Sequence, residues 1–156
     1  MDQLAATCER IASYTSRLKK VSILSEYLRG LEDLDFARAV RFLCCGPLAT
    51  EGHKFSIGGA TLREAMLAAS GFDTYIVGLC YTAVGDSGET AGLLMRGRSA
   101  GEAMSLAEAE LLYARLYKTH RTADRVELLR TMFLRYRPET LKFFVKVITG
   151  NLRIGL

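Results

Sequence analysis

The sequence predicts an all-α domain of roughly eight to ten helices packed in pairs, and three observations support this prediction. Apolar residues recur three or four positions apart along most of the chain. Capping residues and glycines mark the ends of successive segments, and no alternating pattern typical of a strand exceeds about four residues. The chain has 156 residues, of which 49% are apolar and 24% charged, so we assign residues 1–156 to a single domain with one core.

The first helices are predicted by apolar spacing and by their caps. Ser16 is placed to cap a second helix, and Gly30 to end it. The apolar positions of these two helices are Leu4, Ile11, Leu18, Val21, Ile23, Leu24, Tyr27, Leu28 and Leu31. Asp33 or Asp35 opens a third helix, which Gly46-Pro47 stops. Its expected apolar face consists of Phe36, Ala39, Val40, Leu43 and Cys44.

The middle of the chain carries two capping boxes, in which a hydroxyl and a carboxylate satisfy backbone N–H groups at the start of a helix. Thr61 and Glu64 form the first box, and Ser105 and Glu108 form the second. We therefore expect one helix to begin at Thr61 and another at Ser105.

Between these boxes lie two shorter helices and a loop. Asp73 caps a helix whose inward residues are expected to be Ile76, Val77, Cys80, Tyr81 and Val84. Gly85-Asp86 then breaks the chain before a short helix, which Asp86 or Ser87 is expected to cap and which ends near Met95. The stretch 96–101, rich in glycine and arginine, is expected to be the main flexible loop.

Three helices are expected in the last third. The first follows the Ser105 box and presents Leu111, Leu112, Leu116 and Tyr117. Thr122 opens the next, whose apolar residues are Val126, Leu128, Leu129, Met132 and Phe133. Pro138 suits the first turn of the last helix, and Gly150 ends it. That helix is expected to bury Leu141, Phe144, Val145 and Ile148.

Charge is distributed unevenly along the chain. The formal net charge of +4 arises after Gly78, because the residues up to Gly78 are balanced in charge. The excess is largest from Arg115 onward, where ten basic residues face three acidic ones in 42 residues. Such a segment attracts polyanions, with a phosphate backbone as the leading candidate. The alternative is a solvated helix surface that happens to be basic.

The cysteines, Cys8, Cys44, Cys45 and Cys80, do not form a Cys-x-x-Cys pair, and only His53 and His120 could join them as ligands. We therefore expect no metal site and interpret the cysteines as buried, reduced thiols, which suits a cytoplasmic protein. No apolar run approaches a bilayer span, and no secretion signal is visible, so no membrane association is expected.

A weak internal repeat places an Ile-Gly step after two helix ends. Ile57-Gly58 follows the helix that ends at Gly46, and Ile154-Gly155 follows the helix that ends at Gly150. Glycines allow a phosphate to approach the backbone, and helix N-termini favour anions. Arg63 and Arg153 could add a fork of donors beside each step. Two such loops on one face would grip two backbone stretches of a duplex, whereas the plainer interpretation is two turns with glycine caps.

Several motifs resemble the N-terminal, DNA-binding domain of ATP-dependent DNA ligases, particularly those of the compact bacterial type. The most specific is PETLKFFVKVITGNLRIGL at 138–156, which is similar to the family's P-E-E-x-K-x-x-x-R-x-I-x-G-x-L-R-I-G-L helix and turn. Weaker matches are GDSGET at 85–90, SLAE at 105–108, and the glycine turn and helix from Phe55 to Met66.

This resemblance implies an all-helical domain with a pseudo-two-fold arrangement, whose loops grip the minor groove on both sides of a nick. Contacts in that family are mostly to phosphates and sugars and are not sequence-specific. The DNA-binding residues that the resemblance implies here are Lys54, Gly58, Gly59, Thr61 and Arg63 in the middle of the chain, and Gly150, Asn151, Arg153 and Gly155 near its end. The middle region is less basic than in the bacterial relatives, with only Lys54 and Arg63.

The resemblance also implies the setting of the domain. The parent would be an ATP-dependent DNA ligase that joins strands through a lysyl-AMP, with ATP and Mg as cofactors. No lysine here lies in the family's Lys-x-Asp-Gly motif, so we expect no catalytic residue, no cofactor and no strand joining in this chain alone. The implied partners are nicked double-stranded DNA and the adenylation and OB domains of the same polypeptide. We expect a monomer located in the cytoplasm with the nucleoid.

Two other functions are weighed against DNA binding. Gly85-Asp86-Ser87-Gly88 mimics the nucleophile turn of trypsin-like proteases, but His53 and His120 lie in unsuitable settings, and the chain is helical. The remaining alternative is a helical protein–protein interaction module without DNA binding. No period of 30–45 residues recurs, and salt dependence would separate a phosphate contact from an apolar interface.

Overall fold

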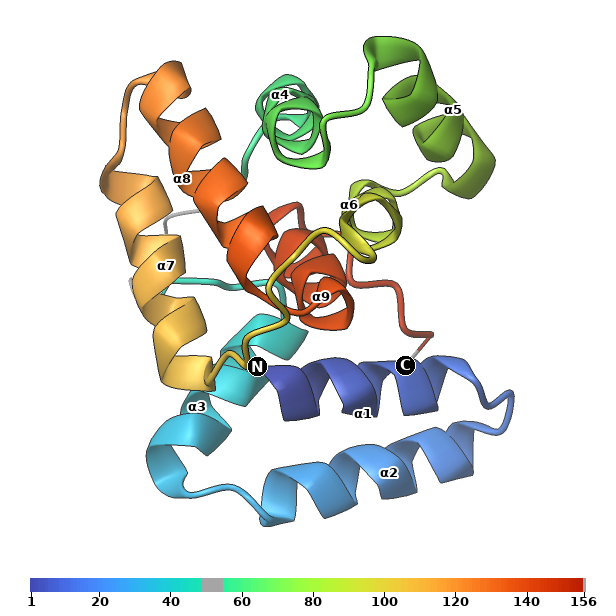
Figure 1. The fold of residues 1–156 in the computed structure, drawn as a ribbon. Coiled ribbons are helices and arrows are strands. Elements are labelled where there is room, and N and C mark those ends of the chain that lie inside the picture. Colours follow the sequence, from blue (N-terminus) through green and yellow to red (C-terminus); the bar gives the residue numbers. More distant parts are fainter. Residues whose placement is uncertain (49–54, 156) are drawn as a thin grey trace.

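The computed structural model describes residues 1–48 and 55–155, and over these residues the chain is all-α (Figure 1). The helices are α1 (Asp2–Ala12), α2 (Arg17–Arg29), α3 (Asp33–Leu43), α4 (Gly59–Ser70), α5 (Thr74–Val84), α6 (Ser87–Met95), α7 (Leu106–Lys118), α8 (Thr122–Arg135) and α9 (Pro138–Ile148). Within the described ranges there is no strand, only an isolated bridge between Glu102 and Tyr136. The predicted fold class is confirmed.

Helix α9 forms the centre of the molecule (Figure 1). Residues on all its sides are buried, namely Thr140, Leu141, Phe143, Phe144, Val145, Lys146, Val147 and Ile148. Helices α1 and α6 pack directly against it, and α4 packs against α8. This burial explains why α9 is so rich in apolar residues, since apolar side chains gain free energy when they are removed from water.

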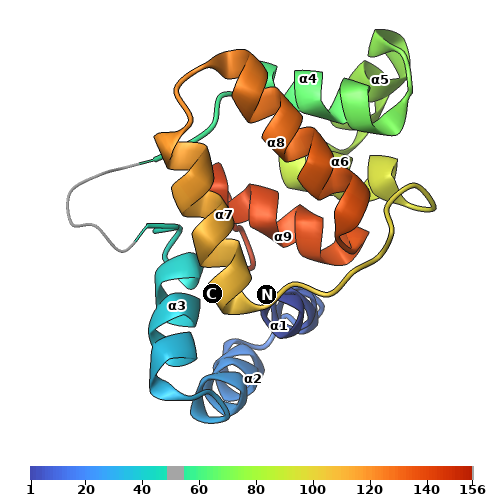
Figure 2. The same ribbon diagram turned by 60° about the vertical axis from the view of Figure 1, so that its left-hand side comes forward.

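An aromatic cluster joins α3, α7 and α9. The Tyr113 ring stacks on Phe144 at a centroid distance of 4.1 Å and meets Phe42 edge-on at 5.2 Å. The buried Tyr113 hydroxyl donates a hydrogen bond to the Phe144 carbonyl at 3.1 Å. Figure 2 shows α3 beside α7. Stacked aromatic rings and a satisfied hydroxyl fix these three helices relative to one another.

Most of the predicted caps are confirmed. The side chains of Ser16, Asp73, Asp86 and Ser105 each accept a hydrogen bond from a backbone N–H in the first turn of the following helix. The second half of the Ser105 box is not formed, because the Glu108 carboxylate accepts a hydrogen bond from the Tyr136 hydroxyl at 2.6 Å. Pro138 occupies the first turn of α9, as predicted.

The capping box at Thr61 was wrong. Helix α4 begins at Gly59 with Gly58 as its N-cap, and no side chain caps it. Thr61 and Glu64 therefore lie inside the helix. The hydroxyl and carboxylate spacing was correct for a box, but the helix starts two residues before the predicted first residue.

Several faces that were expected to be buried are instead exposed. On α5 only Val77 is buried, whereas Ile76 is 37% and Tyr81 51% exposed. The reason is position, since α5 lies at the rim and packs mainly against α4 and α6 (Figure 1). Other expected core residues with large exposed surfaces are Leu18, Val21, Phe36, Val40, Val84, Leu111 and Tyr117. Among the cysteines Cys8 is buried, but Cys44 is exposed.

The stretch 96–101 is tied to the body of the protein, contrary to the expectation of a flexible loop. The Ala100 N–H donates to the Leu134 carbonyl at 2.7 Å. Arg98 donates through Nε to the Ser70 carbonyl at 2.9 Å, and its guanidinium lies over the Phe72 ring. The glycines of this stretch thus allow the chain to turn, and Arg98 fixes the stretch to the body of the protein.

No helix in the described ranges combines the length and the apolar character that a bilayer span requires.

Candidate nucleic-acid interface

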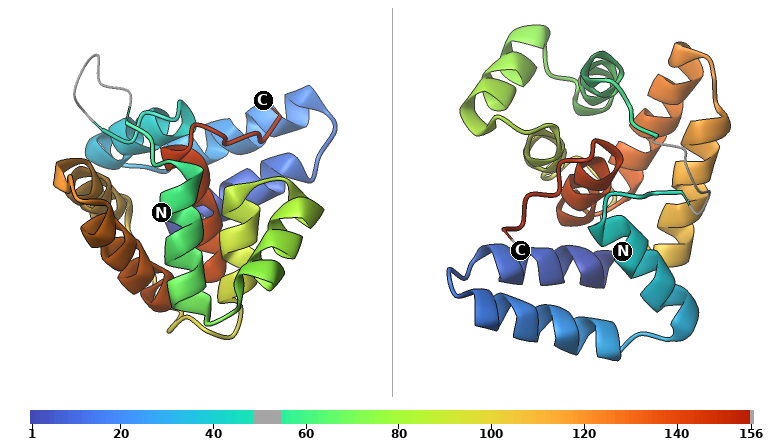
Figure 3. Two further views of the ribbon diagram at one scale, coloured as in Figure 1. Left: turned by 90° about the horizontal axis from the view of Figure 1, so that it is seen from above. Right: turned by 180° about the vertical axis from the view of Figure 1, so that it is seen from behind.

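The two segments that the sequence singled out lie on one side of the molecule. Figure 3 shows the N-terminal end of α4 and the segment 150–155 facing the viewer in the right-hand view, and both in the upper half of the left-hand view. Neither segment is sealed in the interior, because Gly58, Gly59, Gly150 and Gly155 are all exposed. Lys54, the remaining predicted contact of the middle region, lies outside the described residues.

The α4 side of this face presents bare backbone. Gly58 has φ −65° and ψ 147°, and no side chain caps the first N–H groups of the helix. A Cβ added at Gly58 or Gly59 would meet no atom within 4 Å. Arg63 is exposed and forms no ion pair with any described residue, whereas Thr61 is half-buried. Uncapped N–H groups at a helix start, with an arginine one turn further on, can bind an anion.

The C-terminal side is a backbone turn held between buried side chains. Gly150 and Gly155 have φ 70°, and Arg153 has φ 41°. Arg153 is exposed, while Leu152 and Ile154 on either side of it are each 7% exposed. The turn therefore buries its apolar residues and directs the guanidinium of Arg153 away from the core.

Two hydrogen bonds from distant parts of the chain hold this turn. Asn151 donates through Nδ2 to Asp86 Oδ2 at 2.8 Å. Lys20 donates through Nζ to the Gly155 carbonyl at 2.8 Å. Neither Asp86 nor Lys20 was among the predicted site residues. The Gly-Asp step pointed to Asp86 only as a helix cap, and no spacing in the sequence could have linked Lys20 to this turn.

The two helix ends of the predicted repeat share one hydrogen-bond pattern. After α3, the Gly46 N–H bonds to the Arg41 carbonyl at 2.8 Å, and after α9 the Asn151 N–H bonds to the Lys146 carbonyl at 2.8 Å. These are the six-to-one bonds of a Schellman cap. The left-handed residue is Cys45 in the first copy and Gly150 in the second. Gly46 therefore corresponds to Asn151, one residue later than the sequence match suggested, and the wider two-fold relation stays a prediction.

Most of the basic side chains in the C-terminal segment form ion pairs within the protein. Its paired cations are Arg121, Arg130, Arg135, Arg137, Lys142 and Lys146. Burial lowers the pKa of Lys142, but hydrogen bonds to Glu9 and Glu89 outweigh burial, so the net shift is upward. Cations of this segment that form no ion pair with the described residues are Arg115, Lys118, Arg125 and Arg153. The charge excess is therefore not a continuous basic surface.

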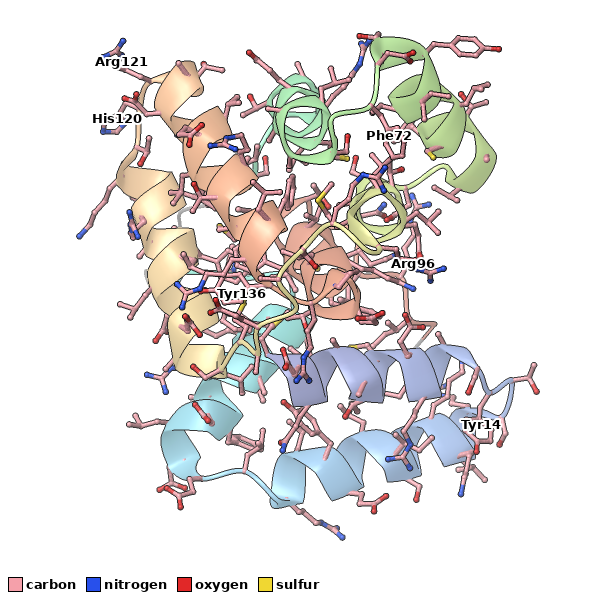
Figure 4. The ribbon with its side chains drawn as sticks, viewed as in Figure 1. Tyr14, Phe72, Arg96, His120, Arg121 and Tyr136 are labelled. Carbon is pink, nitrogen blue, oxygen red and sulfur yellow. The ribbon has the colours of Figure 1, made fainter. Side chains whose placement is uncertain are left out.

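Figure 4 shows other candidate polar groups away from this face. His120 and Arg121 project outward at the turn between α7 and α8, where His120 is exposed as expected for a loop residue. Tyr136 points inward, and burial together with its hydrogen bond to Glu108 raises the pKa of Tyr136 to about 12. Neither position forms a catalytic arrangement, and among the described residues no three His, Cys, Asp or Glu side chains are grouped to hold a metal ion.

A groove of about 590 Å³ lies between α4, α5 and α6. Gly59 and Arg63 line it from α4, and Ser87 and Thr90 line it from the first turn of α6. Its remaining lining residues are Ala60, Met66, Val77, Gly78, Tyr81 and Thr82. The groove thus adjoins the predicted contact residues of α4 and adds an apolar wall.

Comparisons with known proteins show which family the chain resembles. The family model described as DNA ligase N terminus matches residues 1–156. A probable DNA ligase of Koribacter versatilis is 29% identical over the whole chain, which covers 27% of that relative. A probable DNA ligase of Opitutus terrae is 23% identical over 99% of the chain, which covers 19% of the relative. A DNA ligase of Methanothrix thermoacetophila is 24% identical over 99% of the chain, which covers 30% of the relative.

Proposed function

This chain belongs to the family of DNA ligase N-terminal domains, and we propose that it binds duplex DNA without sequence specificity, through the minor groove and the phosphate backbone on both sides of a nick. The observation that carries this proposal is that the start of α4 and the turn 150–155 share one face (Figure 3). Each of these segments supplies exposed glycine backbone and one exposed arginine without a carboxylate partner among the described residues.

The chemistry of both segments suits a phosphate. A guanidinium presents a fork of donors that matches two phosphate oxygens, and Arg63 and Arg153 each have theirs available. At the start of α4, uncapped N–H groups and the positive end of the helix dipole favour the same charge. Backbone contacts of this kind position a duplex but do not read its bases.

The chain spans between 19% and 30% of the relatives described above. For the whole polypeptide we propose ATP-dependent DNA strand joining through a lysyl-AMP, with Mg, in the cytoplasm with the nucleoid. In that arrangement the chain would hold the nicked duplex while adenylation and OB domains of the same polypeptide perform the chemistry. We expect the 156-residue chain alone to bind DNA as a monomer and to join nothing.

Fluorescence anisotropy with labelled nicked and intact duplexes tests the proposal. Arg63→Ala and Arg153→Ala should each weaken binding about equally on all sequences and reduce the slope of log K against log salt by about 1. The matched control is Arg96→Ala, because Arg96 is exposed, forms no ion pair with the described residues, and follows α6 at the end opposite Asp86. Equal effects of all three substitutions would contradict the proposed contacts.

A helical protein–protein interaction module is the second candidate, and α5 is the observation that favours it. The helix contains no charged residue, yet Tyr75 is 71% and Leu79 49% exposed. An exposed apolar face of this kind is typical of an interaction surface. Binding through α5 would change little between 50 and 200 mM salt, whereas phosphate binding would weaken steeply.

A further inference from the structure

The backbone at Arg153 is in a conformation that needs external support. Its φ of 41° places a non-glycine residue in the left-handed region. For an ordinary side chain this region costs free energy and persists only when the surroundings impose it, most often at functional sites. The segment that carries Arg153 must therefore be fixed on both sides.

Asp86 supplies the upstream support. Its Oδ2 accepts the hydrogen bond from Asn151, two residues before Arg153. Its Oδ1 accepts from the Glu89 N–H at 2.8 Å, which caps α6, and lies 3.3 Å from Lys146 Nζ. Asp86 is 8% exposed and Lys146 6% exposed. A single buried carboxylate thus connects the start of α6, the end of α9 and the turn that follows α9.

Gly88, two residues after Asp86, allows α6 and α9 to lie close together. A Cβ on Gly88 would lie 2.5 Å from the Lys142 carbonyl and 2.7 Å from Lys146 Cγ. Only glycine allows the first turn of α6 to approach α9 so closely. The Gly-Asp-Ser-Gly sequence at 85–88 therefore forms a close contact between the start of α6 and α9.

We propose that Asp86 is a positioning residue that holds Arg153 in the conformation in which it meets a phosphate of the duplex. Asp86 itself touches no DNA in this proposal and acts through Asn151. The inference rests on the proposed function, because the benefit of fixing Arg153 is a preformed contact. A preformed turn binds more tightly, since the cost of ordering its backbone is already met in the free protein.

The sign of the electrostatic effect makes the proposal testable. Replacing Asp86 by a neutral residue raises the net charge by one, and general attraction to a polyanion would then strengthen DNA binding. Loss of positioning would weaken binding instead. The two explanations therefore predict opposite changes.

The main variant is Asp86→Ser, and the matched control is Asp73→Ser. Serine caps helices about as well as aspartate, so both variants keep their caps, and in Asp86→Ser the buried Lys146 retains Glu89 at 3.1 Å. Both variants change the charge equally, but the Asp73 side chain accepts a hydrogen bond from the Ile76 N–H and bonds to no other described residue. We expect Asp86→Ser to reduce the salt slope by about 1, as Arg153→Ala does, and the double variant to reduce it no further. Asp73→Ser should leave the slope unchanged.

NMR relaxation of the Arg153 amide separates positioning from DNA contact. We expect an order parameter of about 0.85 in the unaltered chain and below about 0.6 in Asp86→Ser. An unchanged order parameter together with an unchanged slope would overturn the inference. A lowered order parameter, with Arg153→Ala binding as tightly as the unaltered chain, would overturn the proposed DNA contact while leaving Asp86 as the anchor of the turn.

Exchanging the side chains of Asp86 and Asn151 provides the second test if Asp86→Ser does not fold. Asn151→Asp places two carboxylates against each other, while the cap and the Lys146 ion pair remain, so the Arg153 order parameter should fall. Adding Asp86→Asn restores one donor and one acceptor at the original net charge, and order should return. Failure of the swap to restore order would contradict the role of this hydrogen bond.

Discussion

At the residue scale, the glycines of this chain divide into those that the fold requires and those that it does not. Gly88 is required by packing, because any Cβ there would collide with the backbone of α9. Gly59 is different, since it has ordinary helical placement at the start of α4 and open space where a Cβ would be. A glycine that the fold does not require, on an exposed helix start, leaves room for the proposed approach of a phosphate to the backbone.

Gly59→Ala should therefore separate stability from binding. Alanine reduces the entropy of the unfolded chain and favours the helix, so we expect the free energy of unfolding to rise by about 0.4–1 kcal/mol. The added methyl would at the same time hold a phosphate away from the N–H groups of α4, so DNA affinity should fall. Urea unfolding and fluorescence anisotropy measure the two quantities, and a variant that is more stable and binds DNA equally well would argue against contact at Gly59.

The cysteines allow a second prediction at this scale. Burial, with a smaller contribution from Glu9, raises the pKa of the Cys8 thiol to about 12, whereas Cys44 is exposed. Because the thiolate is the reactive form, a disulfide reagent at pH 8 should modify Cys44 readily and Cys8 only after unfolding. Peptide mass spectrometry would identify the sites, and Cys44→Ser is the control. Rapid modification of Cys8 in the folded chain would contradict the described burial.

At the element scale, helix identity follows from local chemistry, whereas helix exposure does not. Ser16, Asp73 and Asp86 each lie directly before a helix that they cap, so their roles could be predicted from adjacent residues. The exposure of α5 could not be predicted, because its sequence is apolar on every side and its rim position depends on the packing of α4 and α6. Spacing within a helix indicates that it is amphipathic or apolar but not which neighbour covers it.

The candidate site likewise contains residues that could be predicted from the sequence and contacts that could not. Arg63, Arg153 and the glycines could be named from the sequence because a family resemblance carried them. The structure then places the start of α4 and the turn 150–155, the two segments that contain the described members, on one side of the molecule. The Asp86–Asn151 hydrogen bond joins residues 65 positions apart, and Lys20 and Gly155 are 135 apart. Contacts at such separations arise from the fold as a whole, so no local pattern records them.

The two predicted capping boxes yield a prediction about helix starts. Ser105→Ala removes a side-chain oxygen that accepts from the Glu108 N–H at 3.0 Å, and we expect it to cost about 1 kcal/mol. Thr61→Ala removes no cap, because α4 starts at Gly59, and its effect should stay within about 0.5 kcal/mol. Urea unfolding of the two variants under the same conditions makes the comparison, and equal destabilisation would place Thr61 at a cap after all.

At the scale of the whole molecule, the net charge of a segment is a poor measure of its attraction to DNA. Lys142 and Lys146 are the clearest case, because their amino groups lie within 3.3 Å of the carboxylates of Glu9, Glu89 and Asp86. A cation that is already paired releases no counterion from a phosphate. The acidic partners come from α1 and α6, so a count restricted to the basic segment misses them.

The salt dependence of DNA binding should reflect the unpaired cations of the face alone. If all ten basic residues from Arg115 onward met phosphates, the slope of log K against log salt would be about −9, at about −0.9 for each contact. Arg63 and Arg153, with Lys54 as a further predicted contact, instead give an expected slope of about −2 to −3. Anisotropy titrations between 50 and 200 mM KCl measure this slope.

Arg130→Ala is the control, because Arg130 is paired with Glu127 at 2.9 Å on the exposed side of α8. Loss of Arg130 should therefore leave the slope unchanged. A slope near −9 would show that the paired cations exchange their carboxylates for phosphates on binding, and the face described here would then be only part of the contact.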